Sequence, residues 1–206
     1  MSDYVLAHTE GPDEVMAGLI AETAAMPNAN MQIAPDQAAF MSLLVRAVDA
    51  RRAIEVGTFT GLSALAVARA LPADGSLLCL DISAEWTAIG RRYWEQAGVS
   101  DRIELRVGPA ADTLAALPEV PTYDIAFVDA DKTGYDGYVE GLYPRMQTNA
   151  LVLLDNTLRG SRVLGGIETS PDDEAVIALN DALIADPRWE TVLLPIADGL
   201  TLLRKR

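Results

Sequence analysis

The sequence of 206 residues is long enough for one domain with its own core, because half of its residues are hydrophobic and 22% are charged. Its formal net charge of −14 argues against a nucleic-acid-binding surface, since polyphosphate backbones are bound by basic patches. The single cysteine, Cys79, excludes an internal disulfide, and no apolar run approaches the ~18 residues of a membrane-spanning helix. We therefore expect a soluble, cytoplasmic protein that binds neither nucleic acid nor membrane.

The N-terminal part of the chain is predicted to contain an arm and two helices. Residues 1–30 begin with a polar arm and continue into an amphipathic helix over 13–26. His8, the only histidine, lies in the arm, where a surface residue is expected rather than a base or a ligand. A second helix is predicted over residues 37–50. Its apolar stripe is expected to consist of Phe40, Leu43, Leu44 and Ala47.

A strand–turn–helix–strand unit follows. Residues 54–56 read as a short buried strand, and a glycine turn from Gly57 to Gly61 leads into a helix. A second apolar run over residues 76–80 ends at Asp81. In such units ligands bind at the carboxyl ends of the strands, beside the N-terminus of the helix. Glycine suits this turn because a side chain would block the approach of backbone to ligand.

Three details of this unit indicate the kind of ligand. Glu55 stands inside the first strand, where an apolar residue would be usual. Gly57 and Gly61 are spaced G-x-x-x-G, so the dinucleotide pattern G-x-G-x-x-G is not met. Asp81, at the end of the second strand, can accept both hydroxyls of a ribose. Together these features favour a nucleoside-like ligand without a diphosphate.

The run E-V-G-T-F-T-G-L-S over residues 55–63, followed by L-C-L-D over 78–81, resembles the first two motifs of class I S-adenosylmethionine-dependent methyltransferases. From these residues alone, an ordinary Rossmann-like turn with an incidental Glu55 is the alternative. Cys79 lies inside the second apolar run and is expected to be a small core residue rather than a nucleophile.

The rest of the chain alternates helices and strands. Helices are predicted over residues 85–97, 112–117, 135–146 and 172–185, and strands over 102–107, 123–128, 151–154, 190–194 and 199–203. The last two strands are expected to form an antiparallel pair. The order predicts an α/β fold: a Rossmann-like, doubly wound, mostly parallel seven-stranded sheet with a C-terminal antiparallel strand and helices on both faces. We expect a single domain over residues 1–206, with a cofactor-binding core over 31–206.

Acidic and amide side chains follow two consecutive predicted strands. Asp129 comes directly after the strand over 123–128, and Asp155 and Asn156 follow the strand over 151–154. Oxygen ligands without histidine or cysteine select hard cations such as Mg²⁺ or Ca²⁺. The alternative is that these residues cap the helices that follow. Because three of them meet at one sheet edge, with Lys132 nearby, the pattern favours a metal site.

The runs F-V-D-A-D-K and L-L-D-N-T-L, after E-V-G-T-x-x-G-x-S, resemble the caffeoyl-CoA/catechol type of cation-dependent O-methyltransferase. The resemblance extends from Met31 to the C-terminal strand. It implies methyl transfer from S-adenosylmethionine to a hydroxyl of a catechol-like, vicinal dihydroxy aromatic molecule, and a homodimer. The N-terminal residues 1–30 and the loop 159–171 are the parts that would shape the acceptor pocket.

The same resemblance implies roles for individual residues. Lys132 is the general base and, with Asp129, forms the catalytic pair. The metal, Mg²⁺ or alternatively Ca²⁺ or Mn²⁺, is held by Asp129, Asp155 and Asn156. The residues implied to contact S-adenosylmethionine are Met31, Ile33, Glu55, Gly57, Thr58, Ser63, Asp81, Ala110 and Asp129.

Several alternatives remain open from the sequence. Lys132 can offset the charge of the acids without taking a proton, and Met31 can serve loop packing alone. An NAD-dependent oxidoreductase is a second class, which the missing third glycine disfavours. A non-catalytic binding protein with a cofactor fold is a third class, which the presence of Lys132 and all the proposed metal ligands disfavours.

Overall fold

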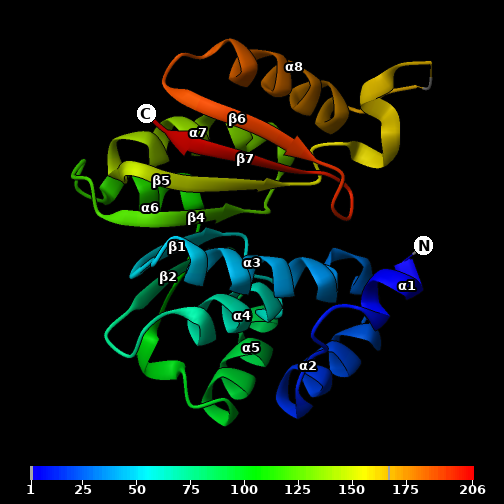
Figure 1. The fold of residues 1–206 in the computed structure, drawn as a ribbon, viewed down its shortest axis with the longest axis vertical. Helices are drawn as coiled ribbons and strands as arrows, with labels where there is room; N and C mark the ends of the chain where they lie inside the picture. The colour runs from blue at the N-terminus through cyan, green and yellow to red at the C-terminus, as the bar shows by residue number, and fades with distance from the viewer. Residues whose placement is uncertain (1, 167) are drawn as a thin grey trace. The chain divides into compact units, whose positions relative to one another are not determined.

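The computed structural model describes residues 2–166 and 168–206 (Figure 1). Seven strands form one sheet. In sheet order they are β3 (Ile103–Val107), β2 (Ser76–Asp81), β1 (Arg52–Val56), β4 (Tyr123–Val128), β5 (Met146–Asp155), β7 (Leu200–Lys205) and β6 (Trp189–Leu194). β2 pairs with β3 and β4 with β5 in parallel, while β7 is antiparallel to both β5 and β6. The predicted mostly parallel sheet with a C-terminal antiparallel strand is confirmed.

The chain divides into two compact units, which we describe separately. The first comprises residues up to 53 together with 58–108, and the second comprises residues 54–57 and 109–206. The single domain predicted over 1–206 stays a prediction, as does the homodimer. No helix in the described part of the chain is both long and apolar enough to cross a membrane.

The first unit contains five α-helices among its described residues: α1 (Ser2–Ala7), α2 (Glu14–Ala24), α3 (Pro35–Ala47), α4 (Leu62–Ala70) and α5 (Ala84–Gln96). α2 begins where the Asp13 carboxylate accepts the Met16 N–H at 2.9 Å, and α5 begins where the Ser83 hydroxyl accepts the Trp86 N–H at 3.2 Å. α3 packs beside α4 (Figure 1), of which eight of nine residues are buried. α4 is therefore the core helix of this unit.

Two expectations for the first unit are wrong. Residues 2–7 form α1 instead of a polar arm, and α1 contacts α3, so tertiary packing supports a short helix that is not evident from its sequence; Met1 lies outside the described residues. The predicted stripe of α3 is also misplaced, because Leu43 is 65% exposed. The buried face follows the same 3–4 spacing one position away. It consists of Gln37, Ala38, Met41 and Val45.

The second unit contains three α-helices among its described residues: α6 (Ala110–Ala116), α7 (Tyr135–Leu142) and α8 (Pro171–Ala185). Three short 3₁₀ helices connect its elements: η3 (Lys132–Gly134), η4 (Tyr143–Arg145) and η5 (Arg159–Leu164). The helix predicted over 135–146 is shorter than expected, because the chain turns into η4 at Pro144. Figure 1 shows α8 lying along β6, with which it is in contact.

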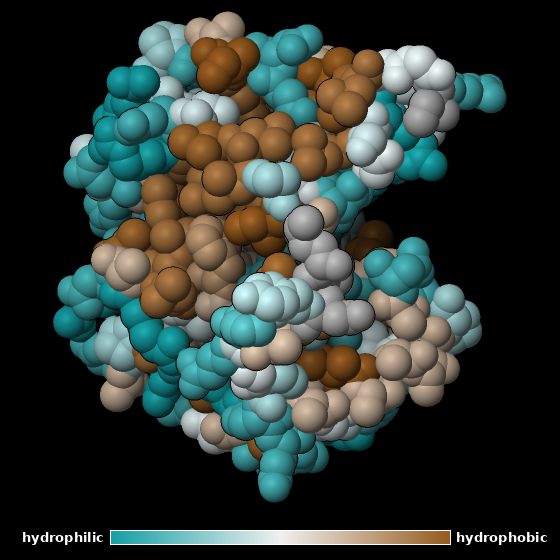
Figure 2. Space-filling view, turned by 45° about the vertical axis from the view of Figure 1, so that its right-hand side comes forward, coloured by the Kyte–Doolittle hydropathy of each residue, from teal (hydrophilic) through white to brown (hydrophobic). Residues whose placement is uncertain are grey.

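Apolar side chains fill the interior of both units and also reach the surface. Cys79, as predicted, is a buried core residue of β2. Figure 2 shows apolar side chains gathered in patches between hydrophilic ones. The large apolar side chains with the greatest exposure among the described residues are Tyr4, Leu43, Ile82, Leu164 and Ile184. Exposed apolar patches of this kind are common where proteins bind ligands or partners.

Candidate active site

In the first unit, Asp81 holds the turn that follows β1. One oxygen of its carboxylate, Oδ2, accepts the backbone N–H groups of Thr58 and Phe59, each at 2.8 Å. The other oxygen, Oδ1, accepts the N–H of Ser83 at 2.7 Å. The side chain is buried. Asp81 therefore fixes the conformation of the turn, in which Phe59 adopts a positive φ of 50°.

These bonds limit what else Asp81 can accept. An ionised carboxylate offers about four lone-pair sites. Three of them are used by Thr58, Phe59 and Ser83. About one site therefore remains, on Oδ1, so the expected double contact with a ribose would have to share an oxygen that is already in use.

The two glycines of the turn are required by packing. A Cβ on Gly57, in the second unit, would lie 2.0 Å from the carbonyl oxygen of Asp129. A Cβ on Gly61, in the first unit, would lie 2.6 Å from the ring of Trp94, whose indole N–H donates to the Gly61 carbonyl at 3.1 Å. Both glycines also have positive φ. The structure thus supplies packing reasons for both glycines, and the approach of a ligand to this turn stays a prediction.

The other residues predicted to bind the cofactor lie in different settings. In the first unit, Ile33, Thr58 and Ser63 are buried, while Met31 at the end of η1 (Ala29–Met31) is 43% exposed. The buried hydroxyl of Thr58 has no hydrogen-bond partner among the described residues. In the second unit, Glu55 is buried within β1, and Ala110 is the half-buried first residue of α6.

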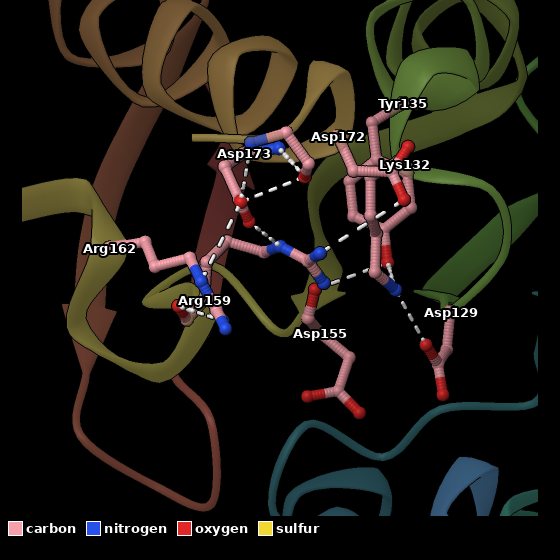
Figure 3. Close-up of polar contacts among 9 residues, drawn as sticks. Asp129, Lys132, Tyr135, Asp155, Arg159, Arg162, Asp172 and Asp173 are labelled. Atoms are coloured by element: carbon pink, nitrogen blue, oxygen red, sulfur yellow. Dashed lines mark hydrogen bonds and ion pairs between the residues drawn. The ribbon is translucent and has the colours of Figure 1, made fainter. Parts of the chain in front are cut away.

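In the second unit, Asp129 and Asp155 lie next to each other at the carboxyl ends of β4 and β5. The two strands are parallel, and Val128 pairs with Leu154 in the sheet. Because paired positions of neighbouring strands point to the same face, the residues that follow this pair present their side chains together. Figure 3 shows both carboxylates pointing in the same direction from the strand ends. The Asp155 side chain is buried, and that of Asp129 is 19% exposed.

Lys132 is tied to this pair from η3. Its Nζ donates to Asp129 Oδ1 at 2.8 Å and to the hydroxyl of Tyr135 at 2.7 Å. The lysine is only 7% exposed, and the tyrosine is fully buried. Burial, and then the charges of Asp129 and Asp155, raise the pKa of Tyr135 well above its usual range. Tyr135 therefore remains a neutral hydroxyl.

The three predicted metal ligands do not act as helix caps. The residue that precedes η3 is Asp131, without a capping hydrogen bond from its side chain, and the residue that precedes η5 is Leu158. Asn156 has a positive φ of 55°, and its N–H donates to Asp155 Oδ1 at 2.7 Å. No group of three or more His, Cys, Asp or Glu side chains in the described chain could hold a metal ion. The predicted metal ligands are not such a group, because they are two carboxylates, Asp129 and Asp155, and one amide, Asn156.

The loop after Asn156 is bound to α8 through ion pairs (Figure 3). The guanidinium of Arg159 donates to Asp173 Oδ1 at 2.8 Å, and that of Arg162 lies 3.8 Å from Asp173 Oδ2. Asp173 also accepts the N–H of Ser170 at 2.9 Å and its hydroxyl at 2.8 Å, and Ser170 in turn caps the helix. Ile167, within the predicted acceptor loop, lies outside the described residues.

Comparison with known proteins shows the family of this chain. A family model described as O-methyltransferase matches residues 7–206. This chain belongs to the O-methyltransferase family. It is 38% identical over 218 residues to caffeoyl-CoA O-methyltransferase 5 of Nicotiana tabacum, covering 98% of this chain and 89% of the relative. It is likewise 38% identical over 214 residues to caffeoyl-CoA O-methyltransferase of Petroselinum crispum, with the same coverage.

Solved structures of methyltransferases have the same fold as this O-methyltransferase. The SAH-bound methyltransferase of Podospora anserina superposes with a TM-score of 0.90 at 27% identity, covering 100% of this chain and 93% of that one. The O-methyltransferase TomG of Streptomyces achromogenes, in complex with SAM, gives a TM-score of 0.83 at 26% identity, covering 94% and 90%. The chain is thus an S-adenosylmethionine-dependent O-methyltransferase, and the alternative of an NAD-dependent oxidoreductase is set aside.

Four side chains of this O-methyltransferase make contacts or have an exposure that the sequence did not single out. Tyr135 accepts a hydrogen bond from Lys132, a predicted site residue, and Arg159 donates one to Asp173. Ile82, the residue after Asp81, is 74% exposed, and Phe59 packs edge-on against Trp86 with ring centroids 5.3 Å apart. The position of Ile82, an apolar residue directly after the acid at the end of a strand, could have been noted from the sequence. The other three depend on contacts that periodicity does not encode.

We expect Asp81→Asn to weaken both the fold and the binding of S-adenosylmethionine. An amide nitrogen would replace one carboxylate oxygen and face an N–H donor, and a buried N–H without a partner costs about 1–3 kcal/mol. The free energy of unfolding in urea should fall by about that amount. The affinity measured by calorimetry should fall about tenfold. Asp74→Asn, at an exposed ion pair with Arg51, is the matched control. If Asp81→Asn were as stable as the wild type, the role of Asp81 in fixing the conformation of the turn would be contradicted.

Asp173 predicts a pH-dependent contribution to stability. Hydrogen bonds from Ser170, first from its N–H and then from its hydroxyl, together with Arg159, lower the pKa of Asp173 to about 2. A lowered pKa in the folded state stabilises the protein above about pH 4, and this contribution is lost as the pH falls from about 4 to 2. The melting-temperature gap between wild type and Asp173→Asn should therefore be largest above pH 5 and close towards pH 2. Asp172→Asn should show a small gap throughout, and a gap for Asp173→Asn that ignores pH would contradict the assignment.

Proposed function

We propose that this O-methyltransferase transfers the methyl group to one hydroxyl of a vicinal dihydroxy aromatic molecule with the help of a divalent cation. The observation that carries the proposal is the pair of carboxylates, Asp129 and Asp155, on neighbouring residues of the parallel strands β4 and β5. Lys132 contacts this pair, because its Nζ donates a hydrogen bond to Asp129 at 2.8 Å. Two hydroxyls on adjacent ring carbons match a site with two carboxylates and one amine.

The donor set fits a hard cation. Asp129, Asp155 and Asn156 offer oxygen atoms as ligands. Asp129 and Asp155 follow paired residues of neighbouring strands, and Asn156 is the next residue after Asp155. We propose Mg²⁺ as the resident ion, with Ca²⁺ and Mn²⁺ as alternatives. What such an ion supplies when bound is Lewis acidity toward a hydroxyl pair and a template that orients it.

Lys132 is proposed as the general base. In its amine form, Nζ takes the proton from the reacting phenol, and the phenol oxygen then forms a bond to the methyl carbon as the bond from that carbon to sulfur breaks. A phenol with a pKa near ~10 is a weak nucleophile at neutral pH, so removal of its proton is needed. Tyr135 is no candidate for this step, because its raised pKa keeps it protonated. The alternative role of Lys132 is to offset the charge of the acids.

Residues that bind the methyl donor are proposed for each unit by itself. In the first unit these are Met31, Ile33, Thr58, Ser63 and the remaining acceptor site of Asp81. The unpartnered hydroxyl of Thr58 supports this, because buried hydroxyls normally have a partner. In the second unit they are Glu55, Gly57, Ala110 and Asp129.

The acceptor of the methyl group is proposed to be small and uncharged. Relatives are named for caffeoyl-CoA. The net charge of −14 disfavours a polyanionic thioester and supports a small uncharged acceptor.

The test of the acceptor class is a matched pair of substrates. Catechol and phenol should be compared as acceptors of the labelled methyl group under identical conditions with Mg²⁺. We expect catechol to be methylated at least about 100-fold faster, because a site built for two polar groups rejects an analogue that lacks one. Equal rates for the two molecules would contradict recognition of a hydroxyl pair.

A further inference from the structure

We propose that Tyr135 is the positioning residue for Lys132, and that its buried hydroxyl fixes the place of Nζ beside Asp129. The inference rests on the proposed function, in which Lys132 serves the reacting hydroxyl. Tyr135 itself contacts no reacting atom. The side chains of Tyr135, Lys132 and Asp129 (Figure 3), and the carbonyls that the tyrosine contacts, all belong to the second unit.

The hydrogen bonds of the Tyr135 hydroxyl show which way it faces. Its oxygen lies 3.1 Å from the carbonyl oxygen of Val128 and 3.1 Å from that of Asp155. A phenol has one proton, and both carbonyls only accept, so that proton is directed to the strand ends. The lone pairs of the oxygen are left for the third contact, Nζ of Lys132 at 2.7 Å. The hydroxyl thus joins the ends of β4 and β5 to the lysine.

The surroundings leave Lys132 little freedom. Its Nζ is bonded to Asp129 at 2.8 Å and to Tyr135 at 2.7 Å, and it lies 4.7 Å from the centroid of the same tyrosine ring. Free lysine side chains have high rotamer entropy, which a reaction would otherwise have to overcome at each turnover. Because a misplacement of about 1 Å can lower a rate by ~10²-fold, an anchored Nζ has a direct kinetic value.

The chain offers a matched control on the same helix. Tyr138, one turn further along α7, is also largely buried and donates its hydroxyl to Asp131 at 2.6 Å. In the described part of the chain, its hydrogen bond goes to Asp131 and not to Lys132. Tyr135→Phe and Tyr138→Phe therefore remove the same atom from the same helix, but only the first removes a partner of the lysine.

The kinetic experiment is a double-mutant cycle with Lys132→Met. For Tyr135→Phe we expect kcat to fall about 10- to 100-fold, with KM for catechol and the affinity for S-adenosylmethionine within twofold of wild type. Tyr138→Phe should keep wild-type kcat. In the Lys132→Met background, Tyr135→Phe should cause no further loss, because its target is gone. A wild-type kcat for Tyr135→Phe, or the same loss in both backgrounds, would overturn the inference.

A spectroscopic measurement tests the contact without relying on activity. The sequence contains two lysines, Lys132 and Lys205, so ¹⁵N-lysine labelling gives two Nζ signals. Lys205 donates to the carbonyls of Tyr143 and Met146 at 2.8 and 2.9 Å and serves as the internal reference. In the wild type we expect both ammonium groups to be rotationally restricted. A freely rotating Lys132 ammonium would overturn the inference, even if Tyr135→Phe failed to fold.

The two measurements separate the two hypotheses. If the wild type methylates no dihydroxy aromatic acceptor, the proposed function fails, while the Nζ signal still shows whether Lys132 is held. If the wild type is active but Tyr135→Phe is equally active, only the positioning role fails.

Discussion

The Asp155→Ala variant is expected to lose methyl transfer while S-adenosylmethionine still binds. Asp155 supplies one of only two carboxylates in the proposed cation site, at the end of β5 and beside Asp129. Substitutions of residues that merely support metal ligands lower affinity or activity by about 10–100-fold, so loss of a ligand should exceed about 100-fold. Turnover and cation affinity should fall together, as measured with labelled donor and with Mn²⁺ titration.

Two controls separate this result from loss of the fold. Asp181→Ala changes an exposed carboxylate of α8 and should keep wild-type activity. Asp155→Asn keeps the shape of the buried side chain and should still weaken the binding of the cation. If Asp155→Ala retained cation affinity but lost the binding of S-adenosylmethionine, the assignment of Asp155 to the cation site would be wrong.

The second large effect is expected from Lys132→Met. General-base help is typically worth ~10²–10⁴ in rate, so kcat should fall within that range. Removal of the ammonium leaves Asp129 without its 2.8 Å partner, so cation affinity should be kept or increased. The affinity for S-adenosylmethionine should stay near the wild-type value. The measurement is the single-turnover rate with saturating catechol.

Lys205→Met is the control for this variant, because it removes the other lysine of the chain and should leave kcat unchanged. An unchanged kcat for Lys132→Met would rule out Lys132 as the base. Lys132→Arg keeps the positive charge but cannot take up a proton, so wild-type kcat in that variant would favour charge compensation over the role of base.

The positions of the acids were predictable from the sequence because of a rule of sheet geometry. Neighbouring parallel strands end at the same edge, so Asp129 and Asp155 had to lie close once β4 and β5 were recognised. The strands follow from apolar runs, and the predicted bounds of β2 and β4 agree closely with the structure, whereas β5 begins at Met146, before the predicted residues 151–154. The fold and the main site motif therefore follow from local signals.

The remaining features depend on contacts between segments distant in sequence. The bond from Tyr135 on α7 to the carbonyl of Asp155 spans 20 residues, and the pairing of Arg159 with Asp173 spans 14. Asp81 was expected to face a ligand, but it also accepts N–H groups of a turn 22 and 23 residues away. For α3, two apolar stripes at the same spacing overlap, and only packing against α4 decides which one is buried.

The most direct test of the account is methyl transfer from labelled S-adenosylmethionine to catechol, measured with Mg²⁺, with EDTA, and with Mg²⁺ added back after EDTA. We expect transfer with Mg²⁺, loss of transfer with EDTA, and recovery when the ion is added back. Transfer that persists unchanged in EDTA would leave the O-methyltransferase in place and contradict the cation site at Asp129, Asp155 and Asn156.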